Sequence, residues 1–542
     1  MFLESVRPPD TGPAMDLAHL VRRYRKSLMV LMVGFLVTSG FLLRLQDIDY
    51  KPLGGDEVAM LMWSQGVLAK GYPHIAASPR TAEKVYTTSE IVPYPMALSI
   101  AIFGANEFGL RLPGAIFGAL TIALLYLTGR TLFHARIGLF AAVLYTFLPY
   151  AINMSQFARY VSQVQFFAIL TGYLFYKAIN SEKINAKYVY LAAVAYIFTY
   201  LSWEGSSFLL LGLFVGLVAF KRRDLTWLKD RHLWQGVGLI MLVVALELVF
   251  RKLANVGHLR LGTGTSDISI TPQWLQPMYD PYVYVYNFLF MKNINLLTFV
   301  AAIGLPFAFK NRTLGYLYPL IFVPLVLMTN LLEVRDFRHV YYTLPFLILL
   351  VSHASFAVLD WLAPLGQPSP CSKLLHGLNT SIRIGFLGLL IVTSNDYVLK
   401  LYEMPGINAP AQSRLDVGDN GGIRVAVDLL RGENPPAGPI VSNQPHMVSL
   451  YYGKADYYVE TRLQIPVFIA QDEPIAIHRI TGSPLIYTEQ DLKSVLDQSP
   501  RAWFLNVKEM TQFYDQEFVN YVEENMPMAF EDRALFLYRW RH

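Results

Sequence analysis

The chain has 542 residues, of which 54% are hydrophobic and 16% are charged, and its mean hydropathy is +0.35. This composition is too apolar for an ordinary soluble enzyme and indicates an integral membrane protein. The formal net charge of +5 comes largely from basic loops and does not indicate a nucleic-acid partner. The single cysteine, Cys371, falls in a predicted cytoplasmic loop, so we expect no disulfide in the outer part of the chain.

The predicted elements begin with an apolar segment over residues 27–43, which is long enough to cross a bilayer of about 30 Å. Later apolar runs of similar length cover residues 112–129, 137–156, 160–178, 188–202, 205–220, 235–250, 294–309, 313–332, 340–359 and 384–400. The shorter stretch 91–103 contains two prolines and is predicted to lie as a helix at the interface, in the first outer loop. The sequence therefore predicts a mainly α-helical, polytopic membrane protein with about 11 transmembrane helices.

The orientation of these helices follows from the lysine and arginine residues, because short loops rich in these residues stay in the cytoplasm. A basic cluster between Arg22 and Lys26 precedes the first span and places the N-terminus inside. An odd number of spans then places the C-terminus outside. Asp56 and Glu57, just beyond the first span, also fall on the outer side.

After about residue 400 the sequence changes character, because glycines and prolines interrupt short apolar runs and no run reaches spanning length. Residues 439–442 and 502–507 are predicted strands, and residues 489–498 have helical apolar spacing behind a capping signal at Thr488 and Asp491. We therefore expect a soluble α/β domain of about 140 residues. The predicted division is a cytoplasmic N-terminus at 1–26, a transmembrane domain at 27–400 with its first outer loop at about 45–110, and an outer domain at 401–542.

The candidate site residues gather on the outer side of the predicted topology. Asp56 and Glu57 form an acidic pair there, and the other candidates in outer loops or at outer helix ends are Lys84, Glu90, Arg159, Glu204, Arg335, Arg338 and His339. Structural interpretations stay open for each of them. The acids can complement a helix dipole, the arginines can reach the membrane interface, Glu204 can be a turn residue, and His339 can simply be packed.

Four short motifs occur in an order that resembles a known superfamily. They are Gly55-Asp56-Glu57, Glu107 to Pro113 (EFGLRLP), Arg159-Tyr160, and Arg338 to Pro345 (RHVYYTLP). Their order resembles the membrane-embedded GT-C glycosyltransferases of the protein O-mannosyltransferase and aminoarabinose-transferase type, glycosyltransferase family 39. The resemblance runs from about residue 28 to residue 360, so it implies the GT-C fold for the transmembrane domain.

The resemblance implies transfer of one sugar, with inversion, from a polyprenyl-phosphate donor in the membrane to an acceptor outside the cytoplasm. Asp56 would be the general base, and Glu57 would orient the acceptor or a helix terminus. The donor phosphate would be bound by cations that fit its oxygens, namely Arg159, Arg335, Arg338 and the point charge of Lys84. The residues expected to contact substrate are Glu204, His339 and Tyr342.

The acceptor is not specified by the sequence, since a lipid, a glycan and a protein hydroxyl all stay open. We expect an integral protein of a bacterial inner, or plasma, membrane, in contact with membrane lipid. Asp56, Glu57 and Glu204 offer oxygen ligands for Mg²⁺ or Mn²⁺. Residues 159–165, however, carry glutamines where many members of the group carry a second acid, which argues against a metal held by two separated acids.

Two alternatives from other functional classes stay open. One is a flippase or transporter of lipid-linked sugar, for which ionisable groups near the middle of the membrane are expected. Glu247 is the clearest acid within a predicted span. The other is a non-catalytic scaffold with a GT-C-like fold, against which the intact Asp56-Glu57 pair argues.

Overall fold

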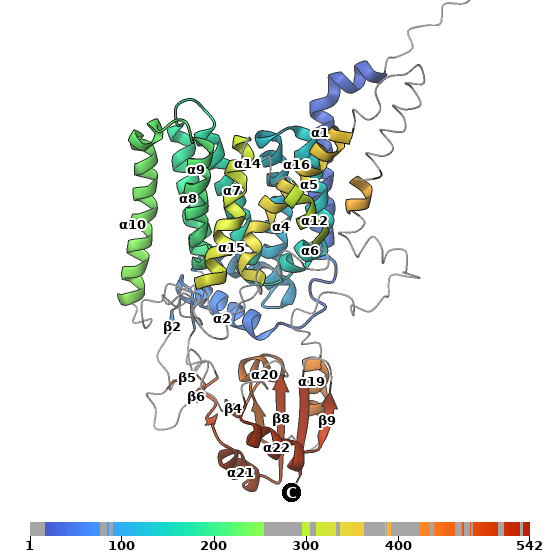
Figure 1. Ribbon diagram of the computed structural model, residues 1–542. Coiled ribbons are helices and arrows are strands. Elements are labelled where there is room, and N and C mark those ends of the chain that lie inside the picture. Colours follow the sequence, from blue (N-terminus) through green and yellow to red (C-terminus); the bar gives the residue numbers. More distant parts are fainter. Residues whose placement is uncertain are drawn as a thin grey trace, which may run out of the picture.

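A helical bundle and a smaller region of mixed strands and helices make up the computed structural model (Figure 1). The residues described are 17–75, 84–85, 90–253, 295–303, 311–331, 337–362, 385, 387–391, 422–432, 438–460, 469–470, 477–478, 481–507, 514–531 and 535–541. The bundle comes from the part of the chain before residue 400, and the smaller region lies at one end of it (Figure 1).

The bundle helices follow the predicted apolar runs. They are α1 (Leu17–Leu45), α4 (Glu107–Leu132), α5 (Ala135–Phe147), α6 (Pro149–Ser155), α7 (Val161–Ile179), α8 (Ala186–Ser202), α9 (Phe208–Phe220), α10 (Arg231–Leu253), α12 (Asn295–Ile303), α14 (Arg312–Leu317), α15 (Pro319–Leu331) and α16 (Leu344–Leu362). Within the described residues, five helices are long and apolar enough to span a membrane, or six if one bent pair is a single span. The chain is therefore mostly helical and membrane-embedded. Most of the predicted run 384–400 and Cys371 lie outside the described residues.

The predicted span at 137–156 is not one straight helix, because the structure divides it into α5 and α6, which meet at an angle of 65°. Leu148 adopts an extended conformation at the break, with φ −67° and ψ 115°. Pro149 begins the second helix, and a proline disfavours helical backbone at the residue before it. The same proline is well tolerated in a first helical turn, where its missing N–H has no partner to lose.

The segment between α1 and α4 contains two helices, α2 (Gly55–Lys70) and α3 (Pro93–Phe103), and a short hairpin of β1 (His74–Ile75) with β2 (Lys84–Val85). Gly54 caps the N-terminus of α2, and Gly71, in a left-handed conformation with φ 82°, ends it. The helix lies between the bundle and the C-terminal region (Figure 1). Helix α2 therefore begins where the membrane part of the chain meets the C-terminal part.

The C-terminal region contains a six-stranded sheet in the order β7-β4-β3-β8-β10-β9. Its strands are β3 (Ile440–Ser442), β4 (Tyr457–Val459), β7 (Leu485–Ile486), β8 (Arg501–Val507), β9 (Met528–Glu531) and β10 (Leu535–Arg541), and a separate pair joins β5 (Ile469–Ala470) to β6 (Ile477–His478). The first four strands of the sheet run parallel, while β10 and β9 are antiparallel. The helices of this region are α19 (Gly422–Gly432), α20 (Pro445–Tyr452), α21 (Glu489–Asp497) and α22 (Gln516–Asn525).

The capping signal predicted ahead of residues 489–498 is confirmed. The Thr488 side chain accepts a hydrogen bond from the Asp491 backbone N–H, and the Asp491 carboxylate accepts one from the Thr488 N–H in return. The two predicted strands are also present as β3 and β8, which pair in parallel. Local sequence signals were sufficient here because each depends on residues within a few positions of one another.

Glycines allow two bundle helices, α4 and α5, to approach closely. A Cβ atom placed on Gly138 would lie 2.3 Å from the backbone oxygen of Tyr126, and one on Gly129 would lie 2.6 Å from the Gly138 Cα. Neither obstacle is the end of a flexible side chain, so the helices would have to separate. Small residues at helix crossings serve this purpose in membrane proteins.

We predict that Gly138→Ala lowers the free energy of unfolding by about 1–3 kcal/mol, because overpacking forces the α4–α5 backbone contact apart. Thermal unfolding in a mild detergent is the measurement. The matched control is Gly34→Ala in α1, where a Cβ meets nothing within 4 Å. Equal melting temperatures for the two variants would contradict the close crossing.

Candidate functional site

The candidate site centres on the carboxylate of Asp56, in the first turn of α2. Its Oδ1 lies 3.3 Å from Nη1 of Arg159, and its Oδ2 accepts a hydrogen bond from Nη1 of Arg338 at 2.9 Å. Arg159 lies just before α7, and Arg338 lies in the short 3₁₀ helix Phe337–Thr343. Three candidates from distant parts of the sequence thus meet at one carboxylate.

The charge state of Asp56 follows from these contacts. Burial raises the pKa of Asp56, whereas the charges of Arg159 and Arg338 and the hydrogen bond from Arg338 lower it, and the balance lies below the ordinary value. The carboxylate is therefore ionised at neutral pH. Its side chain keeps 45% of its surface exposed, so a substrate group can still approach it.

Glu57, the second acid of the pair, is in a different environment. Its carboxylate forms a bidentate ion pair with the Arg111 guanidinium, with Nε to Oε1 at 2.8 Å and Nη2 to Oε2 at 2.6 Å. It also accepts hydrogen bonds from the backbone N–H groups of Gly54 and Ala158. Both side chains of the ion pair are buried, at 4% exposure for Glu57 and 6% for Arg111. Glu57 thus caps α2 and joins it to α4.

Arg111 also fixes the loop that leads into α2. Its Nη1 donates to the carbonyl oxygens of Ile48 and Lys51, and its Nη2 donates to that of Pro52, at 2.7 to 3.1 Å. The donors of one guanidinium therefore hold both the loop and the first turn of α2. The EFGLRLP motif, which contains Arg111, is thus a structural clamp behind the exposed carboxylate of Asp56.

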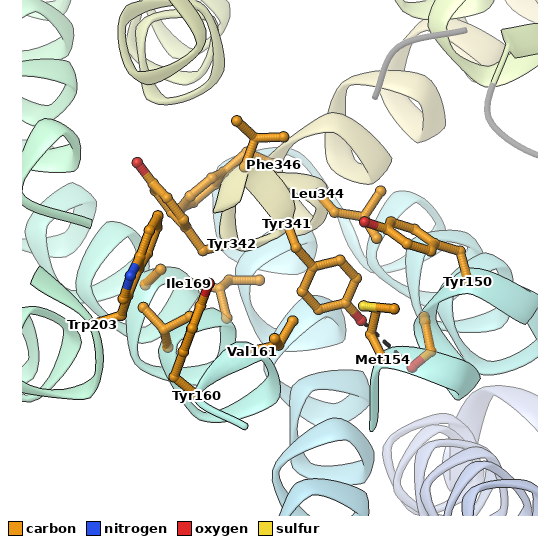
Figure 2. Close-up of a cluster of buried hydrophobic side chains, with 14 of the residues drawn as sticks. Tyr150, Met154, Tyr160, Val161, Ile169, Trp203, Tyr341, Tyr342, Leu344 and Phe346 are labelled. Atoms are coloured by element: carbon orange, nitrogen blue, oxygen red, sulfur yellow. Dashed lines mark hydrogen bonds between the residues drawn. The ribbon is translucent and has the colours of Figure 1, made fainter. Parts of the chain in front are cut away.

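An aromatic stack lies next to Arg159. Tyr160 and Trp203 stack with ring centroids 4.9 Å apart, and the His339 ring stacks on Trp203 at 5.2 Å. Tyr342 meets Trp203 edge to face at 6.2 Å (Figure 2). The stack joins the residue after Arg159 to the residue after Arg338, and so holds the two arginines at a fixed separation.

The predicted substrate-contacting residues are all buried. His339 belongs to the stack, and Tyr342 donates a hydrogen bond to Met328 Sδ at 3.8 Å within the bundle. Glu204 begins a short 3₁₀ helix directly after Trp203 and is also buried. Packing was the open alternative for His339, and the structure gives Tyr342 a packing role as well.

The remaining candidates are only partly described. Lys84 pairs through its backbone with Ile75, and its side chain lies outside the described part of the structure, as does all of Arg335. Glu247, the acid inside a predicted span, accepts a hydrogen bond from the Tyr200 hydroxyl at 3.0 Å. It is buried between α10 and α8, and α10 lies at the edge of the bundle (Figure 1).

A divalent cation does not fit the predicted ligand set. Glu57 has both oxygens on Arg111, and Asp56 has one oxygen on each of two arginines, so the carboxylates would have to leave strong partners. Among the described residues, His, Cys, Asp and Glu side chains form no group of three that could hold a metal ion. The arginines supply the positive charge of this site.

Two residues of this site were not predicted from the sequence. Arg111 lies inside a motif that the sequence singled out, but its role depends on a partner far from it in the chain. Trp203 precedes Glu204, and nothing in its local sequence indicates that it stacks between Tyr160 and His339.

Comparisons with known proteins find a family match over part of the chain and solved structures of similar fold. Residues 89–250 match the family described as dolichyl-phosphate-mannose-protein mannosyltransferase. A search of curated proteins finds no significant match. Among solved structures, ArnT from Cupriavidus metallidurans in the apo state has a TM-score of 0.59 at 12% identity, covering 95% of this chain and 98% of that chain.

Two further structures contain lipid phosphates. ArnT from the same organism, bound to undecaprenyl phosphate, has a TM-score of 0.58 at 12% identity, with 95% and 98% of the two chains covered. The archaeal oligosaccharyltransferase AglB from Archaeoglobus fulgidus, in complex with an inhibitory peptide and a dolichol-phosphate, has a TM-score of 0.51 at 13% identity, with 95% of this chain and 74% of that chain covered. The similarity of fold thus extends over nearly the whole chain.

We predict that the two neighbouring acids differ in how much they contribute to stability. Glu57→Gln leaves the buried Arg111 without its counter-charge and should lower the free energy of unfolding by about 3–5 kcal/mol. Asp56→Asn changes a half-exposed group and should cost about 1 kcal/mol or less. Thermal unfolding of both variants in detergent provides the comparison. A Glu57→Gln protein as stable as Asp56→Asn would contradict the clamp.

Proposed function

We propose that the chain is a membrane glycosyltransferase of the GT-C type, which moves a single sugar from a polyprenyl-phosphate donor to an acceptor on the outer side of the membrane. The family match over residues 89–250 and the similarity of fold to ArnT and AglB support this proposal. The observation that carries this proposal is the ionised, partly exposed carboxylate of Asp56 between Arg159 and Arg338. An acid and two arginines together supply a base for the acceptor and cations for a phosphate.

Asp56 is the general base in this proposal. Its carboxylate takes the proton from an acceptor hydroxyl as that oxygen attacks the anomeric carbon, a role worth about 10²–10⁴-fold in rate. The bond between the anomeric carbon and the phosphate oxygen breaks, and its electron pair leaves with the phosphate. Attack opposite the leaving group inverts the configuration of that carbon.

Arg159 and Arg338 bind the phosphate of the donor. Their two positive charges face the single negative charge of Asp56, so the cluster of these three side chains carries a net positive charge that suits an anion. When the phosphate shares the two guanidinium groups, their effect on Asp56 weakens. The pKa of Asp56 then rises towards its ordinary value, which makes the carboxylate a stronger base only when the donor is bound.

The solved relatives support the choice of donor. One ArnT structure contains undecaprenyl phosphate, and the AglB structure contains a dolichol-phosphate. A sugar on such a lipid stays in the bilayer, so its transferase must present cations and a base near the membrane surface. We extend the phosphate site to Lys84 and Arg335, and assign Glu57 to the support of the first turn of α2.

We also propose the membrane arrangement predicted from the basic residues. Residues 1–26 face the cytoplasm, residues 27–400 form the transmembrane domain, and residues 401–542 form an outer domain, in a bacterial inner membrane. The position of α2 and the C-terminal sheet at the same end of the bundle supports this arrangement (Figure 1). The acceptor, whether a lipid, a glycan or a protein, would then reach Asp56 from the outer side.

We predict that Arg338→Ala weakens the binding of undecaprenyl phosphate by about 10–100-fold, because a charge-assisted hydrogen bond is worth about 1.5–3 kcal/mol. Asp56→Asn should bind the lipid at least as tightly as the wild type, since it frees both arginines. Affinity for added undecaprenyl phosphate in detergent is the measurement.

The matched control is Arg130→Ala, which removes an exposed arginine at the C-terminal end of α4. Its affinity for the lipid should equal that of the wild type. An Arg338→Ala protein with unchanged affinity would remove this arginine from the phosphate site. Sugar transfer by the Asp56→Asn protein at the wild-type rate would show that Asp56 is not the base.

A further inference from the structure

The C-terminal region docks on the loop that precedes Asp56. The Tyr451 hydroxyl of α20 accepts a hydrogen bond from the Leu53 backbone N–H at 2.5 Å and donates one to Glu107 Oε1 at 3.1 Å. Arg424 of α19 forms an ion pair with the same carboxylate at 2.5 Å and donates to the Tyr50 carbonyl oxygen. These contacts bring the first turn of α20 to the first turn of α2.

His446, in that first turn of α20, reaches the backbone next to Asp56. Its imidazole is buried and hydrogen-bonded to the Gly55 backbone. A Cβ atom on Gly55 would lie only 3.2 Å from His446 Nε2 and 2.7 Å from Gln444 Oε1. Two side chains of the C-terminal region, Gln444 and His446, therefore lie directly against the backbone of α2 one residue before the proposed base.

The position of His446 relative to the sheet is also informative, because α20 directly follows β3. Strand β3 has β4 on one side and β8 on the other, so the chain order reverses beside its carboxyl end. Open α/β sheets commonly place functional residues at this point. Asn443, directly after β3, donates to Asn506 Oδ1 at 2.6 Å and accepts from the Val507 N–H at 2.9 Å. The segment that carries His446 thus starts from a fixed position.

The surroundings of His446 fix its ring and its charge. The ring stacks on His478 at 5.6 Å with an angle of 6°, and Tyr458 meets His478 edge to face at 4.8 Å. Burial lowers the pKa of His446 to about 4, against the raising effects of the Gly55 hydrogen bond and of Asp56. The imidazole is therefore neutral at neutral pH and does not compete with the arginines for the Asp56 carboxylate.

We propose that His446 is a positioning residue for the active site, which holds the first turn of α2 through the Gly55 backbone and thereby sets the orientation of Asp56. The C-terminal region then forms part of the catalytic apparatus rather than a cover over it. This inference rests on the proposed role of Asp56 as the base. A displacement of about 1 Å at a reacting group can cost roughly 10²-fold in rate, so such support matters for catalysis.

Three variants of the full-length protein separate positioning from simple folding. His446→Phe keeps a flat ring against His478 and removes the hydrogen bond, whereas His446→Gln keeps a donor at the position of Nε2. His478→Phe makes the same replacement at the ring that stacks on His446, one ring further from α2. The measurement is amide hydrogen exchange of residues 55–61 in detergent, with the exchange of residues 440–460 recorded as a control for folding.

We expect the His446→Phe protein to exchange the first-turn amides of α2 about tenfold faster than the wild type, as a local opening becomes easier. His446→Gln and His478→Phe should exchange these amides at the wild-type rate. Unchanged exchange in His446→Phe, or equal acceleration in His478→Phe, would overturn the positioning role.

Binding of undecaprenyl phosphate to the same proteins keeps the two proposals distinguishable. A wild-type protein that fails to bind this lipid would contradict the proposed donor, whatever the exchange rates show. A wild-type protein that binds it, together with unchanged exchange in His446→Phe, would contradict only the role of His446.

Discussion

The buried ion pair between Glu57 and Arg111 is the interaction on which the rest of the site depends. It joins α2 to α4 and, through the other donors of Arg111, fixes the loop that begins near Ile48. Residues that are adjacent in a helix point about 100° apart. Once Glu57 faces the protein interior, Asp56 faces Arg159, just before α7, and Arg338, in the 3₁₀ helix before α16. Two neighbouring acids thus serve one structural and one chemical purpose.

The electrostatics of the cluster suit a reaction in which negative charge moves to a lipid phosphate. Asp56 is ionised and paired before substrate arrives, and the two arginines have more positive charge than it neutralises. The aromatic stack of Tyr160, Trp203 and His339 joins the two segments that carry these arginines. Groups that are oriented before the reaction have little reorganisation to perform during it, which is the usual source of electrostatic catalysis.

Much of the bundle was predictable because helix formation in a membrane follows from apolar runs of the required length. The acidic pair and the arginines Arg159 and Arg338 were also recognisable as candidates. For Glu57 the choice between orienting the acceptor and orienting a helix terminus stayed open in the sequence, because its partner Arg111 lies 54 residues away. The contact of His446 with Gly55 was equally hidden, since no local pattern indicates which surface of the bundle the C-terminal region covers. The break at Pro149 had a local signal, but the apolar run around it concealed the change of direction.

The central claim is that this site binds a polyprenyl phosphate that carries a sugar. Native mass spectrometry of the protein purified in a mild detergent tests it most directly, because the measurement needs no knowledge of the acceptor. The account predicts a retained polyprenyl phosphate, with or without one sugar, whose mass would identify the class of donor. A protein that retains no such lipid, even after undecaprenyl phosphate is added, would contradict the account.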